Sequence, residues 1–225
     1  MVLRLFEFIF LFIALPVFCV FELIPFGMFL FFFITLLWCV CVLFFDSTFD
    51  KKQLWHQTAL RPHLKRILIT YVIACFLISL AIYIYDDTLL FLYMRETPLM
   101  WIFLMIIYSV FFVYPQELIY RTFFFHRYKN IFAHRLMMIG ASAIVFSYMH
   151  IVFQNAVAIV LTLAGGVLFA KTYSDTKSTF AVSVEHALYG CFVFSAGLYS
   201  YFIPFNEWII DRIYSVHAHV ITLTC

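Results

Sequence analysis

Residues 98–121 read PLMWIFLMIIYSVFFVYPQELIYR, and this stretch decides the class of fold. Its first sixteen residues carry no charge, which approaches the ~20 apolar residues that a membrane-spanning helix needs. Pro115 then interrupts the helical pattern, and Gln116, Glu117 and Arg121 follow at once. A charged side chain at the bilayer centre costs roughly 2.5–3.5 kcal/mol on insertion scales. The stretch therefore predicts a membrane helix that turns an acid and a guanidinium into the interior of a helix bundle.

The composition of the whole chain supports a membrane protein. Of the 225 residues, 66% are hydrophobic and 12% are charged, and the mean hydropathy is +1.03. Soluble domains usually contain ~45–50% apolar residues, so a water-soluble fold could not bury this much apolar surface. The formal net charge of +2 and the scattered basic residues argue against a nucleic-acid partner.

The hydrophobic runs predict an all-α, polytopic bundle of seven to eight transmembrane helices with a polar interior cavity. Seven spans are expected at about 5–21, 24–45, 67–85, 98–120, 136–153, 155–170 and 179–202. The chain is predicted to be a single membrane domain. In it, residues 1–97 supply about three helices and a basic loop, residues 98–202 form a helix core, and residues 203–225 form an interfacial segment or a poor eighth helix.

Basic residues in the connections predict the orientation of the protein. The connections 46–66, 126–135 and 171–178 are rich in Lys and Arg, whereas 22–27 has none and 86–98 has one Arg against three acids. Alternate connections thus agree, and the positive-inside rule places the N-terminus in the cytoplasm. We expect a multi-pass integral protein of a bacterial inner membrane.

Ionisable side chains interrupt three of the predicted spans. Glu117 and Arg121 are four residues apart, so they share a helix face and can pair in the favourable acid-first order. His150 lies late in the fifth span, and Glu185 and His186 are neighbours in the seventh. If Glu117, Arg121 and Glu185 were ionised and faced lipid, they would together cost on the order of 8–10 kcal/mol. We therefore expect these side chains to face one another across a shared, hydrated site.

Three motifs carry a family resemblance: QELIYR (116–121), FSYMH (146–150) and EHALYG (185–190). In order and placement they resemble the CPBP intramembrane proteases, the CAAX-processing and bacteriocin-processing enzymes also called Abi. That family shows E-E-x-x-x-R on one span, F-x-x-x-H on the next and H-x-x-x-N, or a similar polar ending, on a later one. The resemblance covers roughly residues 98–202. It implies an intramembrane endopeptidase whose substrate is a membrane protein or a lipidated or leader-bearing peptide.

Two positions depart from the family pattern. Gln116 stands where the family has its first glutamate, which is generally held to activate water. Gly190 stands where the last motif has a polar residue that helps to hold the oxyanion. Either the catalytic acid has moved by one residue to Glu117, with Asn155 or Glu185 covering the other gap, or the chain has the family's fold without protease activity.

Our hypothesis for the chemistry assigns the catalytic roles to Glu117, His150, His186 and Arg121. Glu117 takes a proton from a water held by His150, and that water attacks the scissile carbonyl. His186 donates to the oxyanion, and Arg121 pairs with Glu117. The remaining side chains expected near substrate, or in support of the site, are Gln116, Asn155, Glu185, Tyr120 and Phe146.

Other interpretations of the same residues stay open. Two His and a Glu could bind zinc with an open fourth position, but no H-E-x-x-H helix is present, so we expect no metal and no cofactor. A transporter or proton channel could use the same residues as a relay. A catalytically inactive membrane scaffold is favoured by Gln116 and Gly190. The expected partners are the lipid bilayer and the substrate, and the sequence does not determine the oligomeric state.

Overall fold

The computed structural model describes residues 2–21 and 27–202. These residues contain helices and no strands, and seven of the helical segments are long and apolar enough to cross a membrane. The segments are Val2–Val20, Gly27–Phe45, Gln57–Leu89, Pro98–Arg127, Arg135–Phe153, Ala156–Thr176 and Thr179–Phe202. The protein is therefore a multi-pass membrane protein, and the predicted fold class is confirmed. The segment predicted as an interfacial or eighth helix, 203–225, lies outside the described residues.

The α-helices follow one another with short breaks. Their bounds are α1 Val2–Ile9, α2 Leu15–Val20, α3 Gly27–Phe45, α4 Leu64–Asp86, α5 Leu92–Glu96, α6 Pro98–Ile107, α7 Tyr114–Glu117, α8 Phe124–Arg127, α9 Arg135–Met149, α10 Ala156–Thr176 and α11 Thr179–Val193. Turns of π-helix join α1 to α2, α6 to α7 and α7 to α8 without ending the rod, and a further one follows α11.

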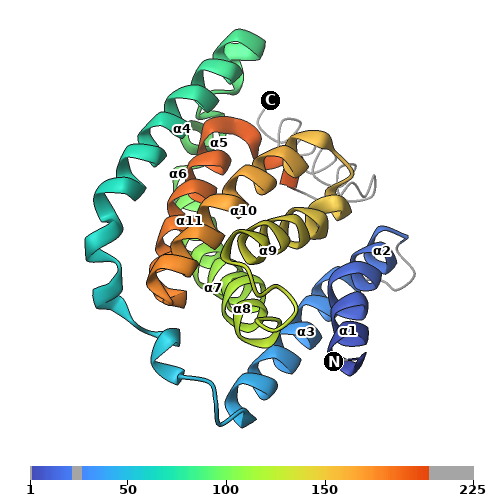
Figure 1. Cartoon of the computed structure of the whole chain (residues 1–225). Helices are drawn as coiled ribbons and strands as arrows, with labels where there is room; N and C mark the ends of the chain where they lie inside the picture. The colour runs from blue at the N-terminus through green and yellow to red at the C-terminus, as the bar shows by residue number, and fades with distance from the viewer. Residues whose placement is uncertain (1, 22–26, 203–225) are drawn as a thin grey trace.

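Helices α7, α9, α10 and α11 form the centre of the bundle. Figure 1 shows α4 along one edge of the molecule and α1 with α2 at the opposite edge. Where α9 and α10 pack, a Cβ atom built on Gly166 would lie 3.1 Å from the Cα and O atoms of Ala143. Since only a glycine fits so close an approach without a shift, Gly166 sets the spacing of α10 against α9.

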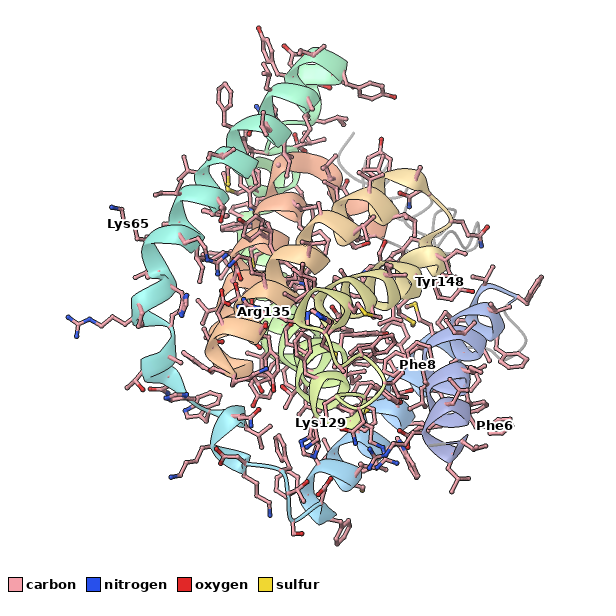
Figure 2. All side chains as sticks on the ribbon, viewed as in Figure 1. Phe6, Phe8, Lys65, Lys129, Arg135 and Tyr148 are labelled. Carbon is pink, nitrogen blue, oxygen red and sulfur yellow. The ribbon has the colours of Figure 1, made fainter. Side chains whose placement is uncertain are left out.

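The outer surface is apolar because its solvent is lipid. On α1, Phe6 points away from the bundle and is 67% exposed, whereas Phe8 points toward the neighbouring helices and packs on the core (Figure 2). The half-buried ring of Phe8 contacts Phe124 and Tyr128 of the α8 region. The two faces of α1 thus match a helix with one side on protein and the other on lipid.

Ion pairs hold the ends of three helices together. Arg127, at the end of α8, donates to Glu7 of α1 through Nε at 2.8 Å. His126 Nε2 lies 2.9 Å from Asp46 Oδ2, just beyond α3. The hydrogen bonds from His126 and from Thr48 hold the pKa of the Asp46 carboxyl below its usual range. These pairs lie outside the apolar interior and fix α1, α3 and α8 at one end of the bundle.

The connection between α3 and α4 covers the start of α11. Ser178 Oγ donates to the His56 carbonyl at 2.8 Å, and Thr179 Oγ1 donates to the Gln53 carbonyl at 3.2 Å. The same end of the bundle therefore carries the connections after α3, after α8 and after α10. These are the basic connections that the sequence grouped together.

Candidate active site

The helix that carries the first motif widens on both sides of Pro115. Turns of π-helix at Tyr108–Val113 and Leu118–Phe123 flank α7. Proline has no N–H to donate, and π-turns, which often occur at functional sites, re-aim the side chains that follow. Glu117 and Arg121 lie in this region, and both are completely buried, with 0% exposure.

Glu117 is the centre of the site. Its Oε1 atom lies 2.7 Å from Nδ1 of His186 in α11, and its Oε2 atom lies 3.3 Å from Nε of Arg121. A carboxylate only accepts hydrogen bonds, so Nδ1 of His186 carries the proton in this pair. His186 is 6% exposed. The structure thus brings together three of the four residues to which the sequence assigned catalytic roles.

Aromatic rings hold the two nitrogen-bearing side chains in place. The guanidinium carbon of Arg121 lies 4.4 Å from the ring centroid of Phe146, within the range of a cation–π contact. Phe169 of α10 stacks on His186 with centroids 4.5 Å apart, and Phe146 of α9 meets the same imidazole edge-on at 5.5 Å. The imidazole of His186 is therefore fixed by rings from two helices as well as by Glu117.

His150 lies beyond Phe146 from this pair. Its Nδ1 atom is 2.7 Å from the Phe146 carbonyl, and the rings of the two residues are 4.8 Å apart. Because a carbonyl can only accept, Nδ1 donates, and Nε2 of a neutral His150 is left with a lone pair for a water or a substrate N–H. Phe146 contacts both imidazoles, so its ring is packed against His150 as well as against His186 of the Glu117–His186 pair. Within the described residues no hydrogen bond joins them directly.

Glu185 faces another part of the bundle. It is 0% exposed, and its Oε1 atom lies 3.7 Å from NH1 of Arg66 in α4. Arg66 also donates to Thr172 Oγ1 of α10 at 2.5 Å. The ~100° between successive helix positions turns Glu185 toward α4 and α10 while His186 faces α7. Arg66, grouped by sequence with the basic loop, instead belongs to α4 and partners this buried acid.

Asn155 has a structural role in the helix bundle that the sequence analysis did not predict. It is the N-cap of α10, where its Oδ1 atom accepts from the Ala158 N–H at 2.8 Å. Its amide nitrogen donates to the Phe153 and Tyr201 carbonyls at 3.0 and 2.7 Å. Since Asn is among the preferred N-cap residues, its position before the run AVAIV was the signal for this role.

Two further expected residues border the site. Gln116 is half-buried in α7 beside Glu117, and in the described part of the chain its side chain makes no hydrogen bond. Tyr120 is buried between aromatic rings, with centroid distances of 5.7 Å to Phe12 and 5.4 Å to Phe146. Tyr120 thus supports Phe146, which in turn contacts Arg121.

The site retains unused hydrogen-bonding capacity. Glu117 Oε2, the three guanidinium nitrogens of Arg121 and both carboxylate oxygens of Glu185 are buried without a hydrogen-bond partner among the described residues. Buried polar atoms usually have partners, so this group can bind water or the polar backbone of a peptide. Among residues 2–21 and 27–202, no three His, Cys, Asp or Glu side chains converge as metal ligands, and we derive no step through zinc.

One residue at the site has no counterpart in the sequence-based prediction. Tyr108 of the π-turn before α7 has its hydroxyl 3.2 Å from Nε2 of His186. A tyrosine inside the run LMIIYSVFFV resembles any packing aromatic, so nothing in the local pattern distinguished it.

Fold and site together define a polytopic membrane protein with a buried acid–imidazole–guanidinium cluster between its helices. Residues 98–192, just under half of the chain, match the family described as Type II CAAX prenyl endopeptidase Rce1-like. The resemblance to the CAAX-processing membrane proteases is thereby confirmed, and this segment contains all three motifs. No curated protein and no solved structure matches the chain.

Proposed function

We propose that this protein is an intramembrane endopeptidase that hydrolyses a peptide bond in a prenylated, CAAX-type peptide. One observation carries the proposal: the fully buried carboxylate of Glu117 is hydrogen-bonded to His186 at 2.7 Å and paired with Arg121 at 3.3 Å. The family match on residues 98–192 supports the class of reaction and of substrate. We further propose a bacterial inner membrane, with the N-terminus and the basic connections in the cytoplasm.

Glu117 is the general base in this proposal. Its Oε1 atom is occupied by His186, whereas Oε2 is free to accept a proton from water. Arg121 pairs with the Glu117 carboxylate at 3.3 Å, and this pairing orients Oε2. Gln116 cannot take its place, since an amide does not accept a proton near neutral pH. His150 holds the attacking water through its Nε2 lone pair.

The chemical step balances within these groups. The water oxygen attacks the scissile carbonyl carbon as Glu117 takes its proton, and a tetrahedral oxyanion forms. His186, when both of its nitrogens are protonated, donates from Nε2 to that oxyanion. Glu117 then gives its proton to the departing amide nitrogen and the C–N bond breaks, so the carboxylate is regenerated. No metal enters any of these steps.

The test uses full-length protein in proteoliposomes and a quenched fluorescent peptide that ends in a prenylated C-a-a-X sequence. We expect the wild type to cleave it and Glu117→Gln to lose at least about 100-fold in kcat, because a positioned base contributes ~10²–10⁴-fold. The matched control is Glu96→Gln, which removes an exposed acid near the start of α6 and should leave turnover unchanged. Cleavage should also persist in strong chelator.

Three results would contradict the proposal. A Glu117→Gln variant that turns over as fast as the wild type would remove Glu117 from the chemistry. A folded wild type that cleaves neither this peptide nor a leader-bearing one would favour the scaffold interpretation. Loss of cleavage in strong chelator would favour the zinc mechanism instead.

A further inference from the structure

A neutral His186 has no proton to offer an oxyanion. Its one N–H, at Nδ1, is donated to Glu117 Oε1 at 2.7 Å, so Nε2 carries a lone pair. In that state an oxyanion forming beside Nε2 needs another donor within reach. The group next to Nε2 is the phenol hydroxyl of Tyr108, at 3.2 Å.

Tyr108 reaches this place because residue 190 is a glycine. A Cβ atom built on Gly190 would overlap the Tyr108 hydroxyl and would come within 2.6 Å of its ring carbons Cε1 and Cζ. Real Cβ atoms essentially never approach other atoms so closely. The hydroxyl thus fills the space that a side chain at position 190, one helical turn after His186, would otherwise occupy. The Tyr108 hydroxyl therefore lies where the third motif's polar side chain, which Gly190 lacks, would be.

The ring of Tyr108 is held rather than free. It makes a T-shaped contact with Phe194, with ring centroids 4.7 Å apart. It makes a second T-shaped contact with the His186 imidazole, with ring centroids 6.2 Å apart. A donor fixed before the substrate arrives costs no reorganisation when charge develops, which is what makes oxyanion donors effective.

We propose that Tyr108 is a catalytic residue: its hydroxyl donates a hydrogen bond to the oxyanion, in the place left open by Gly190. This inference rests on the proposed peptidase function. At rest the hydroxyl donates to His186 Nε2; in the tetrahedral intermediate the same O–H donates to the carbonyl oxygen, and the proton stays on Tyr108. The hydroxyl breaks no covalent bond and needs no co-reactant.

The test is Tyr108→Phe, measured with the prenylated peptide in proteoliposomes. The variant keeps the ring and its contact with Phe194 and removes only the hydroxyl. We expect kcat to fall about 100-fold with KM little changed, since one oxyanion donor contributes ~10²–10³ in kcat. The matched control is Tyr114→Phe, which removes a hydroxyl from the same rod whose partner is the Leu54 carbonyl at 3.0 Å. It should retain wild-type kcat.

A swap of the two side chains separates a catalytic role from a structural one. Tyr108→Ala vacates the space over Gly190, and Gly190→Asn then places an amide donor there. The double variant should regain at least tenfold in kcat over Tyr108→Ala, a gain smaller than one full oxyanion donor. A Tyr108→Phe variant with wild-type kcat, or one in which only KM changes, would overturn the assignment to Tyr108 while leaving the peptidase proposal intact. A wild type without peptidase activity overturns both.

Discussion

Arg121 is a large, fully buried side chain that carries a charge, and its removal tests what that charge contributes to stability. Arg121→Leu leaves the Glu117 carboxylate buried at 0% exposure without its ion-pair partner 3.3 Å away. Breaking a buried pair from one side typically costs 3–5 kcal/mol, chiefly because an uncompensated charge remains. We therefore expect the melting temperature in detergent to fall well below that of the wild type.

The double variant Glu117→Gln/Arg121→Leu supplies the control. It removes both charges, so no ion is left unpaired, and neutral groups of similar size in place of a buried pair are often tolerated. Its melting temperature should recover most of the loss while cleavage stays absent. If the double variant melts no higher than Arg121→Leu, then the loss reflects packing on Phe146, 4.4 Å away, and not the unpaired carboxylate.

At this scale the sequence predicted the pairs that depend on local spacing. Glu117 and Arg121 share a face because they are four apart, and the structure shows them paired. It also predicted that Glu117 and His186 converge from distant spans, because ionisable groups inside a membrane avoid lipid. The contact between Tyr108 and His186 left no such signal. Tyr108 reaches His186 only because Gly190 leaves room, and neither residue implies the other until the helices are packed.

The crossing of α9 and α10 is a close contact between the backbones of two helices. A Cβ on Gly166 would sit 3.1 Å from backbone atoms of Ala143 and 3.3 Å from its Cβ. Backbone cannot swing aside, so Gly166→Ala must push the two helices apart, at a cost of typically 1–3 kcal/mol. Phe146 of α9 and Phe169 of α10 both contact His186. The melting temperature and kcat should therefore fall together.

Gly140→Ala is the matched control on α9. A Cβ built there has no atom within 4 Å, and alanine is the better helix former by roughly 0.5–1 kcal/mol. This variant should melt at or above the wild-type temperature with unchanged kcat. Equal losses in the two glycine variants would show that backbone conformation matters there, and that the close approach at Gly166 does not.

Helix existence was predictable from hydrophobic length, whereas helix ends and irregular turns were not. The span expected at 155–170 continues to Thr176, and in the added turns Lys171 and Asp175 pair at 3.0 Å. The span expected at 98–120 runs on to Arg127, which is anchored by Glu7. The π-turns on either side of Pro115 were not predicted from the sequence.

For the whole molecule, the distribution of lysines gives a direct test of orientation. All six lysines, at positions 51, 52, 65, 129, 171 and 177, lie in or next to the connections after α3, α8 and α10. Figure 2 shows Lys65 extending outward at the start of α4. Hydrogen bonds and ion pairs place these connections at one end of the bundle. The connection between α4 and α6, at the other end, contains no lysine.

An amine-reactive reagent that cannot cross the bilayer should therefore distinguish the two faces completely. If the basic end is cytoplasmic, as the positive-inside rule requires, the reagent labels these lysines in inverted membrane vesicles and leaves them unlabelled in right-side-out ones. Peptide mapping by mass spectrometry identifies each site, and permeabilised vesicles give the maximum label. Labelling of Lys51, Lys52 and Lys129 in right-side-out vesicles would reverse the orientation. It would also place the start of α11, and with it the approach to His186, on the outer face.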